Sequence, residues 1–469
     1  MNISSVELKS KLKLNFGFED FRPDQLEIIV KILNQESILA VMPTGAGKSL
    51  CYQLPALISE FKSVIISPLV SLIDDQVEGL RQNGIEASKI HANQSREINI
   101  KNWKNFVSGA SKLLYLSPER LMQNKMIEAL RKANVKLFVV DEAHCISKWG
   151  VGFRPEYEQL SKLKTLFPLA TIAAFTATAD KATRKDIVQK LSNGKAHIIV
   201  KGFDRPNLYL SVETKPTSKK IFHQMLLDFV KIRKNLSGII YCLSRKETEE
   251  ISLFLNSNGL NTIDYHAGKT PDYRRQAYDR FITEDGIIMV ATIAFGMGID
   301  KPNIRYVIHA SLPSSMEAFY QEIGRAGRDG NNSETLLFFN LSDFIMRQRM
   351  LFDGDESEVF KQIEYQRLNT LLGYCEATSC RRKALLSYFD QDVKNCNNCD
   401  NCKKPPEVKD YSKEAKIIFL AIQQSGQLFG SNHLIDLITG KETEKIINRS
   451  HQNLSSFGLG SHLSKSLIQ

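Results

Sequence analysis

The first 340 residues alternate between short apolar runs and segments whose apolar side chains recur at helical spacing. Runs of about four residues that are apolar on both faces are typical of parallel strands buried between helices. Their alternation with helical segments predicts an α/β fold with ligand-binding loops at the carboxyl ends of the strands. The predicted strands include Ile38–Val41, Val64–Ile66, Leu113–Leu116, Leu137–Val140, Ile172–Phe175, Ile239–Tyr241, Ile287–Val290 and Thr335–Phe339.

Breaks in this pattern predict the domain organisation. A polar stretch at residues 213–220 divides the α/β region into two blocks of similar plan. After about residue 341 the pattern becomes helical and cysteines cluster, and residues 403–410 form a second predicted linker. The remaining segment, 411–469, begins with helical spacing and becomes rich in serine.

Composition narrows the class of protein. With 42% hydrophobic and 24% charged residues over 469 positions, the chain is neither disordered nor collagen-like nor a disulfide scaffold. Its 62 basic and 52 acidic residues give a net charge of +10, which favours a polyanionic partner. There is no signal-peptide pattern and no apolar run of roughly 18 residues, so we expect a cytosolic protein with reduced or metal-bound cysteines.

A phosphate-binding loop is predicted directly after the first apolar run, where residues 41–49 read Val-Met-Pro-Thr-Gly-Ala-Gly-Lys-Ser. Gly45 and Gly47 allow backbone amides to approach phosphates at a helix N-terminus. Lys48 would reach the β- and γ-phosphates, and the Ser49 hydroxyl would bind magnesium. The alternative is a glycine turn before a core helix. The nucleotide-binding residues predicted here are Thr44, Gly45, Ala46, Gly47, Lys48 and Ser49.

The strand at Leu137–Val140 ends in two carboxylates, Asp141 and Glu142. Asp141 can hold magnesium, and Glu142 can orient and activate the attacking water. For the dipeptide alone, an exposed acidic turn would be the default interpretation. We expect His144 to bridge the nucleotide site and neighbouring motifs rather than to transfer protons.

The Asp141-Glu-Ala-His144 sequence (a DEAH box) together with the phosphate loop resembles superfamily-two helicases, and the wider set of motifs resembles the RecQ family of DNA helicases over nearly the whole chain. Residues 16–25, Phe-Gly-Phe-Glu-Asp-Phe-Arg-Pro-Asp-Gln, resemble the N-terminal motif of that family. The resemblance implies that Arg22 and Gln25 read the adenine and that Phe18 stacks near it. An amphipathic helix start is the alternative.

Four further segments resemble family motifs that contact a single strand or couple hydrolysis to movement. They are residues 67–76, 115–120, 175–179 and 290–300. Small hydroxyl residues at strand ends suit sequence-independent phosphate contacts. The resemblance implies strand contacts by Ser67, Thr176 and Thr292, and a nucleotide contact by Asp300.

Residues 320–328, Tyr-Gln-Glu-Ile-Gly-Arg-Ala-Gly-Arg, resemble the arginine-finger motif. Two arginines three residues apart are predicted to share one helix face. A guanidinium there would stabilise the charge that develops on the γ-phosphate. Arg328 is the predicted finger and Arg325 its support; a solvated basic helix end is the alternative.

An aromatic segment follows the acidic pair, at residues 145–157. Trp149 and Phe153 beside Arg154 could stack on unpaired bases. The segment resembles the aromatic-rich loop of the family, which usually has His-Asp where this chain has Val151-Gly152. We therefore expect weaker or differently coupled DNA stimulation of hydrolysis.

Cysteines 380, 396, 399 and 402 provide four thiolates with the spacing of a tetrahedral metal site. An iron–sulfur centre could use the same four ligands. The sequence around Cys380 resembles the zinc-binding segment of the RecQ family, which favours zinc. Cys375 is expected to pack in a helix, and Arg381-Arg382 to face DNA or solvent.

The expected fold is α/β, with two RecA-like parallel-sheet lobes, a helical zinc-binding module and a partial winged helix whose β-wing is short or absent. The predicted domains are 1–207 (ATP-binding lobe), 208–340 (second helicase lobe), 341–406 (zinc module) and 407–469 (partial winged helix).

The expected activity is ATP-dependent 3′-to-5′ DNA unwinding in repair and recombination, with ATP, Mg²⁺ and Zn²⁺ as cofactors. The expected partners are single-stranded, tailed or forked DNA, with a single-strand-binding protein and repair factors as further candidates and no membrane. The expected location is the cytoplasm, on the bacterial nucleoid. A DNA-stimulated translocase or annealing module with little unwinding is the first alternative, and an RNA helicase the second.

Overall fold

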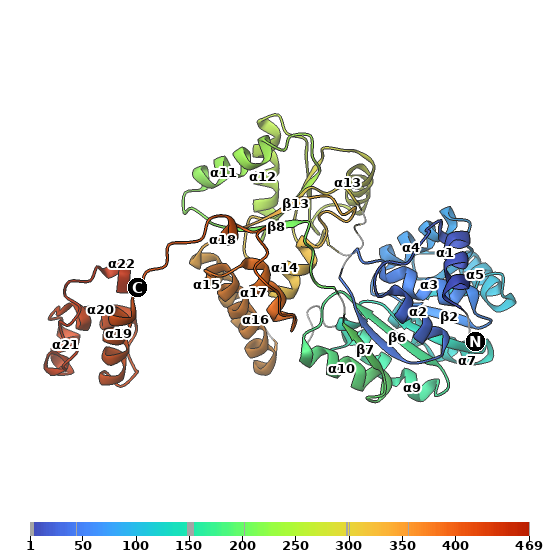
Figure 1. The fold of residues 1–469 in the computed structure, drawn as a ribbon, viewed down its shortest axis with the longest axis horizontal. Coiled ribbons are helices and arrows are strands. Elements are labelled where there is room, and N and C mark those ends of the chain that lie inside the picture. The colour runs from blue at the N-terminus through green and yellow to red at the C-terminus, as the bar shows by residue number, and fades with distance from the viewer. Residues whose placement is uncertain are drawn as a thin grey trace. The chain divides into compact units, whose positions relative to one another are not determined.

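The computed structural model describes residues 4–43, 45–147, 154–200, 202–296, 299, 301–354 and 356–468. The chain divides into two compact units, Met1–Pro405 and Pro406–Gln469. The first unit contains two parallel sheets and a helical module, and the second is small and helical (Figure 1).

The first lobe is built on a seven-stranded sheet in the order β3-β4-β2-β5-β6-β1-β7. Every neighbouring pair is parallel. Its strands are β1 (Ile38–Val41), β2 (Lys62–Ile66), β3 (Ala87–Ile90), β4 (Leu113–Leu116), β5 (Val135–Val140), β6 (Thr171–Thr176) and β7 (His197–Val200).

Helices cover both faces of this sheet, which is why its central strands are mostly apolar. Helices α2, α3 and α4 pack on one face, and α5, α7 and α10 on the other. The helices of this lobe are α1 (Ser5–Phe16), α2 (Gln25–Leu33), α3 (Lys48–Ile58), α4 (Val70–Gln82), α5 (Arg96–Ser108), α6 (Pro118–Leu121), α7 (Asn124–Lys132), α8 (Pro155–Glu158), α9 (Leu163–Leu166) and α10 (Lys181–Ser192), with 3₁₀ turns at Ala143–Ile146 and Gln159–Lys162.

The second lobe has a six-stranded parallel sheet in the order β10-β11-β9-β12-β13-β8. Helices α11 and α12 pack on one face, and α13 and α14 on the other. Its elements are β8 (Leu208–Thr214), α11 (Lys219–Lys231), β9 (Gly238–Tyr241), α12 (Arg245–Ser257), β10 (Thr262–Tyr265), α13 (Pro271–Thr283), β11 (Ile288–Ala291), β12 (Tyr306–His309), α14 (Met316–Ile323) and β13 (Ser333–Phe339).

A helical module follows the second sheet and covers its edge strand β8. The backbone of Cys399 forms a parallel bridge with Leu210, and the Val212 amide donates to an Asp400 carboxylate oxygen at 2.9 Å. These contacts satisfy backbone groups that an edge strand would otherwise leave unpaired. The module consists of α15 (Leu341–Phe352), α16 (Glu358–Glu376), α17 (Arg381–Tyr388) and α18 (Asp400–Lys403).

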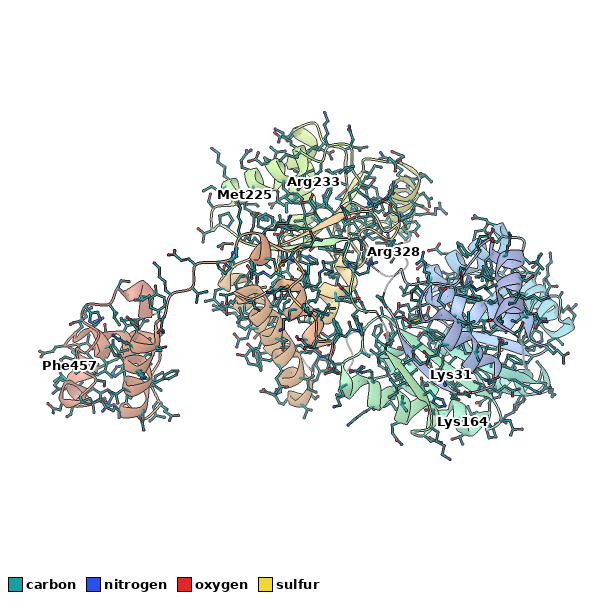
Figure 2. The ribbon with its side chains drawn as sticks, in the orientation of Figure 1. Lys31, Lys164, Met225, Arg233, Arg328 and Phe457 are labelled. Atoms are coloured by element: carbon teal, nitrogen blue, oxygen red, sulfur yellow. The ribbon has the colours of Figure 1, made fainter. Side chains whose placement is uncertain are left out.

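The second unit has a small core around Ala421, Leu437, Ile438 and Ile446, with Phe457 packed against it (Figure 2). Its described residues form helices only: α19 (Ser412–Gln424), α20 (Ser431–Thr439), α21 (Glu444–Asn448), a 3₁₀ turn at His451–Asn453 and α22 (Lys465–Ile468). No described residue of this unit lies in a β-strand.

The predicted fold class is confirmed: all eight predicted runs coincide with strands of two parallel sheets. One detail of the prediction is wrong. The polar break at 213–220 does not separate the two sheets, because β8 already belongs to the second one. Among the described helices, none is both long and apolar enough to cross a bilayer.

Candidate functional site: an ATP-binding cavity and a cysteine cluster

The predicted phosphate loop joins β1 to the N-terminus of α3, which begins at Lys48. Gly45 and Gly47 have φ values of +83° and +76°, which only glycine adopts without strain. A Cβ atom on Gly47 would lie 2.5 Å from Nε2 of Gln25. The loop therefore needs glycine both for its backbone and for a close neighbour. Thr44 lies outside the described residues.

The N-terminal motif packs directly against this loop. Nε2 of Gln25 donates to the carbonyls of Ala46 and Gly47, both at 3.1 Å, and its Oε1 accepts from the Arg22 amide at 2.9 Å. The Arg22 guanidinium donates to the Gly45 carbonyl. Phe18 is 56% exposed and lines a cavity together with Lys48 and Ser49 of the phosphate loop. The structure thus brings the motif to the loop, and the adenine contacts of its three residues stay a prediction.

Asp141 and Glu142 follow β5 at the edge where the phosphate loop lies. Burial raises the pKa of Asp141 to about 6, and the neighbouring Glu142 carboxylate adds to the rise. Burial also opposes ionisation of Glu142, but the surrounding cations, Lys48 first, bring its pKa below the usual range. Glu142 Oε2 is buried and forms no hydrogen bond with a described residue, although His144 Nδ1 lies 3.4 Å from it, which suits a carboxylate that orients a water molecule.

Gln76 connects the acidic pair to α3. The Tyr52 hydroxyl donates to Gln76 Oε1 at 2.8 Å, and Gln76 Nε2 lies 3.5 Å from an Asp141 carboxylate oxygen. Sequence reasoning placed Gln76 only at the end of a strand-contacting segment. Its position beside Asp141 indicates that it orients the carboxylate, a role that nothing in its own spacing revealed.

His144 bridges two motifs, as expected. Its Nδ1 lies 2.8 Å from the Thr176 hydroxyl and 3.4 Å from a Glu142 carboxylate oxygen. Burial lowers the pKa of His144, so the imidazole is neutral near pH 7. The acidic pair is therefore linked to the end of β6.

The predicted strand-contacting side chains differ in exposure. Ser67 and Thr176 are 1% and 0% exposed, and the Thr176 hydroxyl donates to the Thr178 carbonyl at 3.0 Å. Both side chains are buried, and their expected contacts with a DNA strand stay predictions. Arg154 is half-buried and donates to the Pro68 carbonyl at 2.8 Å.

Thr292 is half-buried after β11, and its hydroxyl accepts from the Ala294 amide at 3.4 Å. Its expected strand contact stays a prediction. Trp149, Phe153 and Asp300 lie outside the described residues.

Arg325 and Arg328 line one cavity of about 680 Å³ with Lys48, Ser49 and the acidic pair. The predicted shared helix face is wrong, because α14 ends at Ile323 and both arginines lie in the turns that follow. Figure 2 labels Arg328. Nε of Arg325 is buried without an acceptor among the described residues. The cavity therefore offers cations opposite the phosphate loop, where a phosphate chain would lie.

The four predicted cysteine ligands come together around the N-termini of α17 and α18, where Cys380 and Cys399 are the N-cap residues. The sulfur atoms of Cys380, Cys396, Cys399 and Cys402 all lie within 4.8 Å of one another. Although burial opposes it, backbone amides of Lys383 and Cys396 hydrogen-bond the Cys380 sulfur and lower its pKa to about 7. Four converging thiolates fit a tetrahedral zinc ion.

Cys375 lies outside this cluster, as expected. It is buried in α16, and burial raises the pKa of its thiol to about 12. The expectation that Arg381 and Arg382 face DNA or solvent is wrong, because both side chains are buried, at 6% and 5% exposure. Arg381 donates to Asp400 and to the carbonyls of Tyr374 and Cys375.

Four family models match consecutive parts of the chain. DEAD/DEAH box helicase matches residues 22–187, and the helicase conserved C-terminal domain matches 220–330. RecQ zinc-binding matches 341–403, and the RQC domain matches 405–469.

Curated relatives match almost the whole chain. The ATP-dependent DNA helicase RecQ of Haemophilus influenzae is 42% identical over 97% of this chain and 73% of its own length. The RecQ helicase of Bacillus subtilis is 37% identical over 97% of this chain and 77% of its own.

Solved structures share the fold at low identity. The DEAD-box helicase Mss116 bound to single-stranded RNA has a TM-score of 0.60 at 19% identity, covering 84% of this chain and 94% of its own. The helicase MrfA bound to DNA and AMPPNP also has a TM-score of 0.60, covering 83% of this chain and 58% of its own at 19% identity.

The two parallel-sheet lobes with an ATP cavity define a helicase of superfamily two. The zinc-binding module and the extensive identity to curated relatives go further: the chain belongs to the RecQ family. Its cofactors are ATP, Mg²⁺ and Zn²⁺.

Proposed function

We propose that this chain is an ATP-dependent 3′-to-5′ DNA helicase that couples hydrolysis to movement along a single strand and to duplex unwinding in repair and recombination. The observation that carries the proposal is the cavity in which Lys48, Glu142 and Arg328 meet from two lobes. A nucleotide bound there contacts both lobes, so its hydrolysis changes what holds them together.

The residues of the cavity divide the chemical work. Backbone amides of the loop and Lys48 bind the phosphates, and Ser49 and Asp141 would hold magnesium, which neutralises phosphate charge when bound. Glu142 accepts the proton of the attacking water, because its carboxylate stays ionised. Arg328, supported by Arg325, stabilises the charge on the γ-phosphate.

DNA is the proposed polyanion, in single-stranded, tailed or forked form. Relatives with this domain set carry names of DNA helicases. We include a single-strand-binding protein and repair factors as partners and the bacterial nucleoid as the place of action, because both follow from that substrate. The chain's net charge of +10 suits binding to the phosphate backbone of DNA.

Two alternatives have specific observations behind them. A relative named as a putative ATP-dependent RNA helicase, from Acanthamoeba polyphaga mimivirus, is 37% identical over 97% of this chain and 84% of its own. A DNA-stimulated translocase or annealing module with little unwinding is the other alternative; the described residues of 406–468 contain no strand.

Fluorescence unwinding of a duplex with a 3′ tail, beside the same duplex with a 5′ tail, tests the proposal. We expect ATP-dependent strand release from the 3′-tailed substrate only, and none with Lys48→Ala. Hydrolysis stimulated by DNA without strand release would favour the translocase. Stronger stimulation by RNA of the same sequence would favour the RNA helicase.

A further inference from the structure

The segment that joins the two sheets lies between the cysteine module and the loop that carries the arginines. This segment, residues 204–208, is called the hinge segment below. It follows β7 and leads into β8, so it belongs to neither sheet until Leu208. Its side chains and carbonyls are bound from two directions.

From the module, Arg382 holds the backbone of the hinge segment. Its Nη1 donates to Asp204 Oδ1 at 2.6 Å and to the Arg205 carbonyl at 2.5 Å, and its Nη2 donates to the Leu208 carbonyl at 2.5 Å. Asn398, which lies between two of the cysteines, donates to the Pro206 carbonyl at 3.0 Å. A guanidinium with three acceptors fixes both position and orientation.

From the hinge segment, Arg205 holds the loop that follows α14. Its guanidinium donates to the carbonyls of Gly324, Ala326 and Gly327, at 3.3, 2.9 and 2.8 Å. The carbonyls of Gly324 and Gly327 directly precede Arg325 and Arg328. Arg205 therefore fixes the backbone positions from which these two side chains extend. The side chain of Arg205 also approaches the phosphate loop, with Nη1 at 3.8 Å from an ideal Cβ on Gly45.

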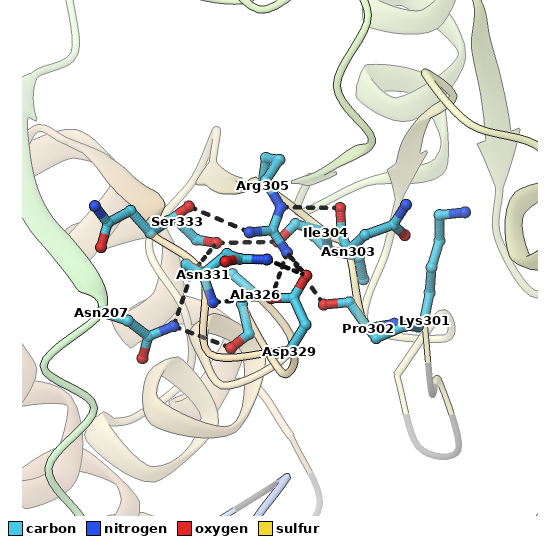
Figure 3. A network of polar contacts seen from close by, with 12 residues as sticks. Asn207, Lys301, Pro302, Asn303, Ile304, Arg305, Ala326, Asp329, Asn331 and Ser333 are labelled. Carbon is cyan, nitrogen blue, oxygen red and sulfur yellow. Dashed lines mark hydrogen bonds and ion pairs between the residues drawn. The ribbon is translucent and has the colours of Figure 1, made fainter.

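The same loop is held on its other sides. Asn207 Nδ2 donates to the carbonyls of Gly327 and Asn331 at 3.0 and 2.9 Å, and Arg305 donates to both carboxylate oxygens of Asp329 at 2.7 Å (Figure 3). Gly327 has a φ of +59°, and an added Cβ would lie 2.4 Å from Asn207 Nδ2. The backbone of the loop is thus defined by contacts from outside it.

We propose that Arg382 and Arg205 act in series as positioning residues, so that the cysteine module sets the placement of Arg325 and Arg328 through the hinge segment. The inference rests on the proposed hydrolysis at the cavity and deepens it. Neither arginine is required to contact ATP. The module then affects the chemical step even without DNA, because a displacement of a catalytic group by about 1 Å can cost a hundredfold in rate.

Steady-state ATP hydrolysis without DNA tests whether Arg382 and Arg205 act in series. We expect Arg382→Ala and Arg205→Ala each to lower kcat about tenfold or more, with the KM for ATP changed less than about threefold. The double variant should be no slower than the slower single variant, because both act through one path. Arg382→Lys should recover part of the rate. Lys383→Ala, on the exposed side of the same helix, is the matched control and should hydrolyse like wild type.

A hydrolysis rate of Arg382→Ala equal to wild type would overturn the inference, as would a double variant slowed by the product of the single effects. Zinc content at the wild-type value shows that the module of Arg382→Ala is intact.

Amide hydrogen exchange of residues 320–330 measures how firmly the loop with Arg325 and Arg328 is held, without the need for ATP hydrolysis. Faster exchange there in both alanine variants, and not in Lys383→Ala, is expected. If wild type itself hydrolyses no ATP, the proposed function fails, while unchanged exchange would separately refute the series.

Discussion

Nδ1 of His144 lies 2.8 Å from the hydroxyl oxygen of Thr176, a contact buried between the acidic pair and the end of β6. The same ring nitrogen lies 3.4 Å from a Glu142 carboxylate oxygen. If binding of single-stranded DNA shifts the loop that follows β6, the shift would therefore reach Glu142, the carboxylate proposed to activate water.

Replacing Thr176 with Val removes the hydroxyl and keeps the side-chain shape. The contact with His144 is worth about 1 kcal/mol, or roughly fivefold, and the bond to the Thr178 carbonyl is lost with it, so DNA-stimulated hydrolysis should fall by at least about that factor while the basal rate changes less. The measurement is kcat with and without single-stranded DNA. Thr171→Val, at the other end of β6 where Thr171 donates to the Gln35 carbonyl, should leave stimulation intact. Equal losses in both variants would contradict the coupling.

Replacing Gly47 with Ala should weaken nucleotide binding. The positive φ costs an alanine about 1–2 kcal/mol, and the new methyl group meets Gln25 Nε2. We expect ATP affinity to fall at least about tenfold, measured with a fluorescent nucleotide. Combining the change with Gln25→Ala removes the clash but keeps the backbone strain, and it also removes the bonds of Gln25 to the loop, so at most part of the affinity should return. Full recovery would show that the glycine conformation is unimportant.

Replacing Cys399 with Ser should remove the metal. Cys399 is fully buried and its backbone pairs with β8, so the loss should also lower stability by about 2 kcal/mol or more. Zinc per chain, measured by elemental analysis, should drop from about one to near zero. Cys375→Ser is the matched control, because it is a buried cysteine outside the cluster and should keep its zinc. Unchanged stoichiometry in Cys399→Ser would remove the assignment.

The second unit should lose stability in mild acid. His433 Nε2 lies 2.8 Å from His451 Nδ1, and burial with the neighbouring His451 lowers the pKa of His433 below 6.5. The unfolded chain then binds more protons than the folded one, so stability is full above about pH 6.5 and falls as the pH drops below that value.

Pulse proteolysis of the full chain, read out as cleavage within 406–469, measures this effect. Cleavage should increase between about pH 7.5 and 5.5, and His433→Gln should flatten the dependence. His462→Gln, on an exposed histidine of the same unit, should retain it. An unchanged profile in His433→Gln would exclude the histidine pair as the cause.

The sequence predicted the central strands well and missed all four edge strands: β3, β7, β8 and β10. An edge strand has only one neighbour, so polar residues enter it and shorten its apolar run, as in Thr262–Tyr265; β7 keeps the run Ile198–Val200 and was nevertheless missed. The central strand β12 was also not among the predicted runs, although Tyr306–His309 is buried throughout.

The chemistry of the site was readable where one short segment contains it, as in the phosphate loop. It was not readable where distant segments meet. Arg205 and Gln76 carry no local signal, because their roles depend on carbonyls and carboxylates far away in the sequence. Arg382 was misjudged because a basic pair on a short helix usually faces solvent, whereas here it binds the hinge segment.

The covering of β8 by the cysteine module has a consequence for the chain without its metal. The Val212 amide and the Leu210 backbone are paired by Asp400 and Cys399, and Cys399 is itself a ligand. Loss of the ion would release this cover and leave a seven-residue strand with an open edge, which is a template for pairing with other chains. Metal depletion should therefore lead to self-association through β8.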